Sequence, residues 1–82
     1  MLDFVKHCYE VTEENQARLR QLMEREDIRY YNGDKLDLDF MLKVGHVLGN
    51  HDPVQNPKQT GYWESKDDVP TYCLRKMITD IK

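Results

Sequence analysis

Apolar residues change their spacing along the chain, and the first change falls near Thr12. Residues 2–11 are rich in aromatic and β-branched types, which favour a strand, although some of them also fall on one helical face. Thr12 supplies a hydroxyl N-cap for a helix over residues 13–26, in which Leu19, Leu22 and Met23 form a narrow apolar stripe. Such a narrow stripe predicts a helix that lies on one face of a sheet.

Residues 28–44 predict a β-hairpin. In the second half an apolar residue stands at every second position, which is the period of a strand with one buried face; these residues are Leu36, Leu38, Phe40, Leu42 and Val44. A three-residue loop over 32–34 sets Tyr30 opposite Leu36 and Arg29 opposite Asp37. The same stretch also has helical spacing, which leaves open a helix from Asp37 or Asp39 to Leu48 with Gly49 as its C-cap.

The last third of the chain predicts a long loop followed by short elements. Residues 49–60 have no periodicity and contain two prolines, which indicates a surface loop. Residues 61–64 predict a short edge strand, and residues 65–68 a charged turn. Pro70 suits the first position of a C-terminal helix, whose apolar residues are Cys73, Leu74, Met77, Ile78 and Ile81.

Together these elements predict one α+β domain over residues 1–82. We expect a small antiparallel sheet of three to four strands with two helices packed on one face, in the order β-α-β-β-(β)-α. If residues 37–48 are helical instead, the domain is mostly α.

Composition narrows the class of partner. The chain has 15 acidic and 12 basic residues and a formal net charge of -3, which provides no broad positive field for phosphate backbones. Nucleic acid is therefore not favoured. Two distant cysteines, Cys8 and Cys73, indicate a reduced compartment rather than a disulfide-stapled secreted domain. We find neither a signal sequence nor a spanning segment, so we expect a cytoplasmic location and no membrane partner.

Residues that often carry chemistry are not grouped in a recognisable motif. The histidines and cysteines lack the paired spacing of zinc ligands, and Asp34, Asp37 and Asp39 do not match a calcium-binding loop. Ser65 lies in a charged turn rather than in a nucleophile elbow. We therefore predict no catalytic residues, no metal and no cofactor.

Aromatic residues beside turns are the candidate contact residues. Tyr and Trp contribute much of the binding energy of protein interfaces. The candidate set consists of aromatic residues at turns and their loop neighbours: Tyr30, Tyr31, Tyr62, Trp63, His51 and Asp52. A structural role, in which Trp63 anchors the small core and Tyr62 covers it, stays open.

Two N-terminal segments, Tyr9 to Gln16 and Ile28 to Gly33, carry a resemblance. This pattern of strand, capped helix and aromatic strand, over about the first 33 residues, resembles small α+β accessory proteins encoded by bacteriophages. The resemblance implies a short protein that occupies a surface of a host protein or complex in the host cytoplasm, and it carries over no functional residue.

We therefore expect a non-enzymatic protein-binding module, an inhibitor of a bacterial host or defence factor, that is compatible with homo-oligomers. A nucleic-acid or nucleotide binder presenting Tyr30, Tyr31 and the helix arginines is the first alternative. A small metal-dependent enzyme is the second.

Overall fold

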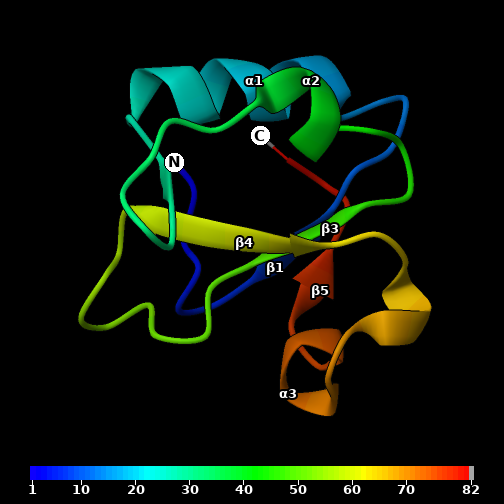
Figure 1. The fold of residues 1–82 in the computed structure, drawn as a ribbon. Helices are drawn as coiled ribbons and strands as arrows, with labels where there is room; N and C mark the ends of the chain where they lie inside the picture. Colours follow the sequence, from blue (N-terminus) through cyan, green and yellow to red (C-terminus); the bar gives the residue numbers. More distant parts are fainter. Residues whose placement is uncertain (82) are drawn as a thin grey trace.

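The computed structural model describes residues 1–81, which form a five-stranded sheet with helices on both of its faces (Figure 1). The strands, in sheet order β2-β4-β3-β1-β5, are β2 Arg29–Tyr30, β4 Gln59–Trp63, β3 Val47–Gly49, β1 Cys8–Glu10 and β5 Met77–Ile78. The helices are α1 Gln16–Arg25, α2 Leu38–Met41, the 3-10 helix η1 Lys66–Asp68 and α3 Thr71–Leu74. The α+β class is confirmed.

The sheet is mixed, so the prediction of an antiparallel sheet is wrong. β3 pairs antiparallel with both β1 and β4, whereas β1 pairs parallel with β5 and β2 pairs parallel with β4. Parallel pairs require long crossovers rather than hairpin turns. The chain supplies them, because α2 and β3 lie between β2 and β4 in sequence, and most of the chain lies between β1 and β5.

Helix α1 confirms the predicted helix, with a later start. The Thr12 hydroxyl accepts a hydrogen bond from the Asn15 backbone N–H (3.2 Å), and the Asn15 side-chain oxygen accepts one from the Thr12 N–H (2.8 Å). This reciprocal pair fixes a turn over residues 12–15, and the helix begins at Gln16. Its stripe of Leu19, Leu22 and Met23 is buried as predicted.

Residues 36–44 are not a strand, and the predicted hairpin is wrong. The Asp37 carboxylate accepts a hydrogen bond from the Phe40 N–H (3.3 Å) and starts α2. The alternative helix is right about this start and wrong about its end, because α2 stops at Met41 and Gly45, with φ of 98°, turns the chain into β3. The chain does reverse after Tyr30, but Arg29 bridges Lys35 rather than Asp37.

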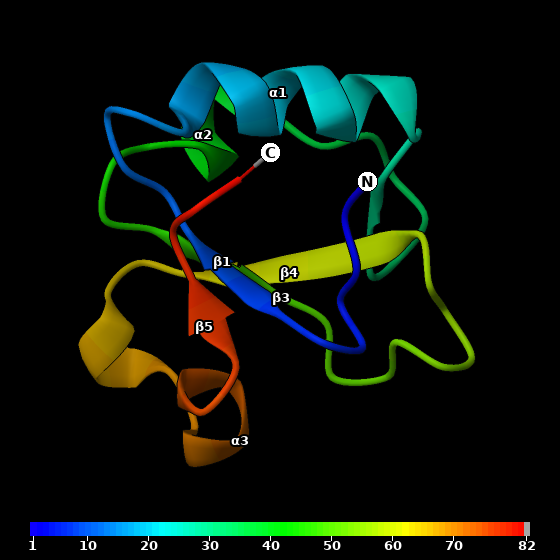
Figure 2. The same cartoon turned by 180° about the vertical axis from the view of Figure 1, so that it is seen from behind.

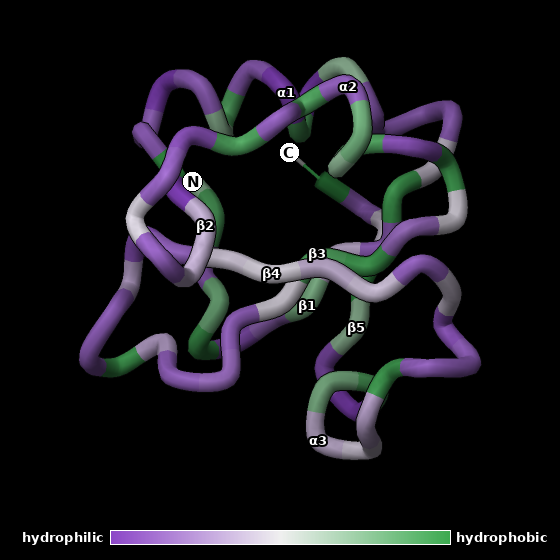
Figure 3. The backbone as a smooth tube through the Cα atoms, in the orientation of Figure 1, coloured by the Kyte–Doolittle hydropathy of each residue, from purple (hydrophilic) through white to green (hydrophobic). Residues whose placement is uncertain are grey.

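The C-terminal predictions are partly right. The loop expected over 49–60 is shorter and covers residues 50–58, because Gly49 belongs to β3 and Gln59 and Thr60 to β4; Figure 3 shows mostly hydrophilic colours along it. The expected edge strand is part of β4, which lies inside the sheet between β2 and β3. The C-terminal helix starts after Pro70 as predicted but ends at Leu74, because the next residues pair with β1, starting with the hydrogen bond from Cys8 N–H to Lys76 C=O (3.1 Å).

The two faces of the sheet are covered by different helices. Tyr9 and Leu48 belong to the large core with α1 and α2, whereas their neighbours Cys8 and Val47 belong to a second cluster that includes Cys73 of α3. Figure 2 shows the same division, with α1 and α2 on one side of the strands and α3 on the other. The expectation that the C-terminal helix shares a face with the first helix is wrong.

Candidate functional site

A pair of glycines forms the floor of the candidate site. Gly49 of β3 and Gly61 of β4 are directly opposite each other, so their missing side chains belong to the same face of the sheet. A Cβ atom on Gly49 would lie 2.6 Å from Cζ3 of Trp63, and one on Gly61 would collide with the Tyr31 ring. Tyr31 and Trp63 therefore each pack over one glycine, in the way that aromatic rings cover glycines in other sheets.

Tyr31 is held in place by polar as well as ring contacts. Its hydroxyl donates a hydrogen bond to the Gly49 carbonyl (2.8 Å), and its ring lies edge-on to that of His51, with centroids 4.5 Å apart. The ring of Tyr30 follows at 5.7 Å. Burial raises the pKa of the Tyr31 hydroxyl, so the hydroxyl remains protonated and a donor at neutral pH.

Loop 50–58 is organised by Asn50, which is only 1% exposed. Its side-chain nitrogen donates to the Asn56 carbonyl (2.6 Å), and its side-chain oxygen accepts from the Asp52 N–H (2.8 Å). The Asn56 N–H in turn donates to the Asp52 carbonyl (3.0 Å). The loop therefore presents His51 and Asp52 from a fixed backbone. Asn50 was not among the predicted site residues, although Asn side chains in turns often hydrogen-bond the backbone two residues further on, as Asn50 does with Asp52.

Helix α3 adds two residues that the sequence analysis missed. Tyr72 and Leu74 are 48% and 43% exposed, on the helix that lies against the same face of the sheet as Trp63. The pKa of the Tyr72 hydroxyl is raised, mainly by burial. The sequence predicted a longer amphipathic helix, whereas the observed helix stops at Leu74 and packs Cys73 into the cluster that Trp63 covers. We call the set Tyr30, Tyr31, His51, Trp63 and Tyr72 the aromatic face.

Tyr62 lies on the opposite face of the sheet from Trp63. Its ring stacks on His46 (centroids 5.5 Å apart, 19° between planes) and meets Phe40 edge-on at 5.2 Å. It also packs against the large core. Of the six candidate residues, four therefore gather around β2 and the loop, Trp63 lies over the neighbouring glycine, and Tyr62 is separate.

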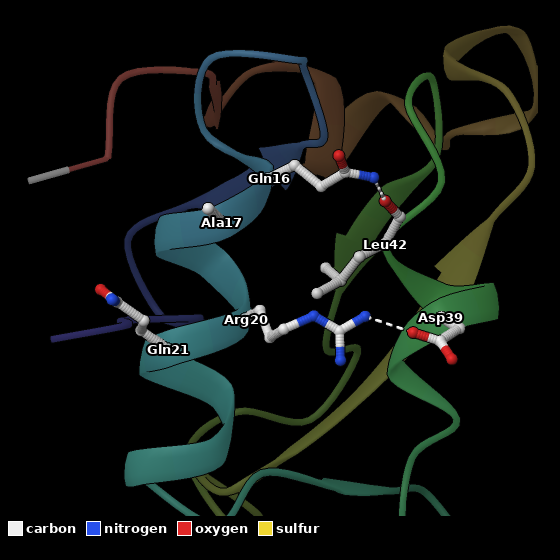
Figure 4. Close-up of a pocket in the computed structure, with 6 residues that line it drawn as sticks. All are labelled: Gln16, Ala17, Arg20, Gln21, Asp39 and Leu42. Atoms are coloured by element: carbon white, nitrogen blue, oxygen red, sulfur yellow. Dashed lines mark hydrogen bonds and ion pairs between the residues drawn. The ribbon is translucent and has the colours of Figure 1, made fainter.

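A hollow of about 510 Å³ between α1 and α2 is a second feature (Figure 4). Arg20 crosses it to the Asp39 carboxylate (2.5 Å), and the Gln16 side chain donates to the Leu42 carbonyl (2.5 Å). Arg20 is therefore paired with Asp39, and Gln16 is bonded to the backbone of Leu42. The hollow lies on the α1 side of the sheet. The sheet itself separates the arginines of α1 from Tyr31, which lies on the opposite side.

Neither metal-ligand geometry within residues 1–81 nor similarity to known proteins indicates a further candidate site. Within residues 1–81, no group of three or more His, Cys, Asp or Glu side chains is placed to hold a metal ion. None of the helices in this part of the chain has the length and apolar character needed to cross a membrane. Comparison of the chain with protein-family models, curated proteins and solved structures gives no match.

Proposed function

We propose that this chain is a non-enzymatic protein-binding module that contacts its partner with the aromatic face. The observation that carries the proposal is the seating of Tyr31 and Trp63 on the Gly49–Gly61 pair. Both side chains are fixed on one side and partly exposed on the other. Aromatic anchors that are already ordered lose little conformational entropy on binding, which is the property of residues that dominate interface energies.

Charge and geometry favour a protein over a nucleic acid as the partner. The net charge of -3 gives no general attraction for phosphates. A nucleic-acid surface of stacking tyrosines and phosphate-binding arginines would need α1 and Tyr31 on the same side of the sheet, and they are on opposite sides. Arg20 is moreover paired with Asp39.

The partner that we propose is a protein or complex of a bacterial host, which the chain would inhibit by covering its surface in the host cytoplasm. The support for this choice is the resemblance of residues 9–33 to phage-encoded accessory proteins. A fixed aromatic surface without catalytic groups suits a protein that acts by occupying a site.

The test is capture of partners from a bacterial lysate by the immobilised chain, quantified by mass spectrometry. We expect the double change His51→Ala and Tyr72→Ala to reduce the captured partner roughly tenfold or more, because both side chains belong to the exposed part of the aromatic face. Neither belongs to the buried core, so the circular dichroism spectrum should not change.

Val44→Ala is the matched control. Val44 is 54% exposed and lies in the turn that follows α2, away from the aromatic face, so its loss should leave capture unchanged. The proposal fails if the double variant still captures the partner at the level of the unchanged chain, or if Val44→Ala reduces capture as much.

A further inference from the structure

The second cluster of the molecule contains both cysteines of the chain. Cys8 of β1 and Cys73 of α3 are each 0% exposed and pack with Val47 and Val69. The two cysteines belong to one buried cluster although 64 residues separate them in sequence, and Cys73 helps to raise the pKa of Cys8. A pair of thiols brought together by the fold differs from a single buried cysteine, because it has a defined oxidation product.

The register of the sheet explains how the thiols meet. Cys8 is paired in parallel with Met77, and Cys73 lies on the short helix just before β5. The chain between them therefore folds back so that Cys73 packs in the same buried cluster as Cys8. Cys8 Sγ would lie 3.1 Å from a Cβ atom on Gly49, beside the Trp63 ring that packs over the same glycine.

We propose that Cys8 and Cys73 form an intramolecular disulfide under oxidising conditions and thereby tie α3 to β1 beneath the aromatic face. The oxidant is a small-molecule disulfide such as oxidised glutathione. One cysteine thiolate attacks it, and a new S–S bond forms as one glutathione thiolate leaves. The second cysteine thiolate then attacks the protein-bound sulfur and expels the second glutathione. Two protein thiols are oxidised, one glutathione disulfide is reduced to two thiols, and the protons of the protein thiols pass to the solvent and the leaving thiolates.

Burial keeps the pair reduced until α3 moves. Neither sulfur has solvent exposure, and the pKa of Cys8 is raised to about 12, first by burial and then by Cys73. Attack on an external disulfide therefore requires a transient opening of the short helix. Helix α3 has only four residues and is exposed at Tyr72 and Leu74, which makes it a segment of low local stability.

The experiment equilibrates the full chain with glutathione buffers of increasing oxidised fraction. Intact mass after alkylation of the free thiols is the readout. We expect a monomer lighter by about 2 Da with no alkylated cysteine. It should form at an oxidised fraction roughly a hundredfold lower than in the chain unfolded in guanidinium, because the native fold holds the sulfurs together.

Two further readouts report on the location of the bond. The melting temperature should rise by roughly 10 °C on oxidation. Emission from Trp63, the single tryptophan of the chain, should fall, because a disulfide beside an indole ring accepts an electron from its excited state. The variants Cys8→Ala and Cys73→Ala should each show neither change, and alanine at these apolar positions avoids burying an additional polar group.

Three results would overturn the proposal. One is oxidation of the native chain at no lower an oxidised fraction than the unfolded chain. The others are a native product that is a glutathione adduct or a dimer linked between chains. None of these outcomes depends on the proposed binding function, which can fail or hold independently.

Discussion

The two faces of the sheet differ in how many apolar side chains they bury. The face under α1 and α2 buries a cluster of eleven apolar residues, whereas the face beneath α3 buries only four, two of them cysteines. On the second face the large rings of Tyr31 and Trp63 are supported by glycines and remain partly open. We infer that the first face provides most of the stability of the fold, and that the second face contributes less and is available for the contact and the disulfide that we propose.

The strongest test of this comparison removes one buried side chain from each face. Leu19 is 0% exposed on the α1 face, and its change to Ala should lower the free energy of unfolding by about 3 kcal/mol. Val69 is 6% exposed on the other face, and its change to Ala should lower the free energy of unfolding by only about 1.5 kcal/mol. Urea denaturation with a common m value measures both. Equal losses would contradict the unequal division of stability.

A second test forces a side chain into the glycine floor. Gly61→Ala should lower the free energy of unfolding by about 2 kcal/mol, because the new Cβ atom collides with the Tyr31 ring. The control is Gly61→Ala combined with Tyr31→Ala, measured by the same denaturation. If Tyr31 is the obstacle, the double variant costs less than the sum of the single variants. If the losses of the two single variants simply add, the glycine is needed for a reason other than the Tyr31 ring.

Alkaline pH should weaken the thiol cluster before the rest of the fold. The folded-state pKa of Cys8, about 12, exceeds its ordinary value of 9.0. The stability that the protonated Cys8 thiol contributes to the folded state is therefore complete below pH 9 and is lost as the pH rises from 9 to 12. Between pH 9 and pH 10 the free energy of unfolding should fall by about 1 kcal/mol. Urea denaturation across this interval measures the fall.

Cys8→Ala is the control, because the free energy of unfolding of this variant should fall less between pH 9 and pH 10. Burial also raises the pKa of Tyr9 and Tyr31, so both variant and unchanged chain should lose stability above pH 10. An unchanged fall between pH 9 and pH 10 in Cys8→Ala would assign it to another group.

The smallest expected effect is at the surface of the α1 face. Arg20 and Asp39 are 42% and 89% exposed, so Arg20→Ala should lower the free energy of unfolding by only about 0.5 kcal/mol. The difference should shrink in 1 M salt, because exposed ion pairs are screened. If Arg20→Ala lowered the free energy of unfolding as much as Leu19→Ala, the Arg20–Asp39 pair would be essential for holding α1 and α2 together.

Sequence reasoning was accurate where local rules decide the structure. The stripe of Leu19, Leu22 and Met23 fixed α1 and its buried side, because helical spacing is a short-range signal. It failed between Leu36 and Val44, where the spacing of apolar residues agrees with a strand as well as with a helix. There the Asp37 cap and the conformation of Gly45 decide the outcome, and α2 becomes a single short turn of helix. Alternation alone could not distinguish these cases.

The remaining errors come from contacts between distant segments. Met77 and Ile78 have the spacing of a helix, yet they pair with β1, and nothing near them in sequence indicates that partner. The site shows the same limit. Its aromatic residues were identified from composition and turns, but the opposite placement of Tyr62 and Trp63 and the role of the two glycines depend on strand register.

The parallel pairing of β1 with β5 has a consequence for synthesis of the chain. During translation, β1 leaves the ribosome early, but the strand that completes its hydrogen bonds is formed by residues 77–78. Until those residues emerge, one edge of β1 has no partner in the fold and is available to other nascent chains. A nascent chain that stalls before residues 77–78 have emerged should therefore aggregate more than one that stalls after they have emerged.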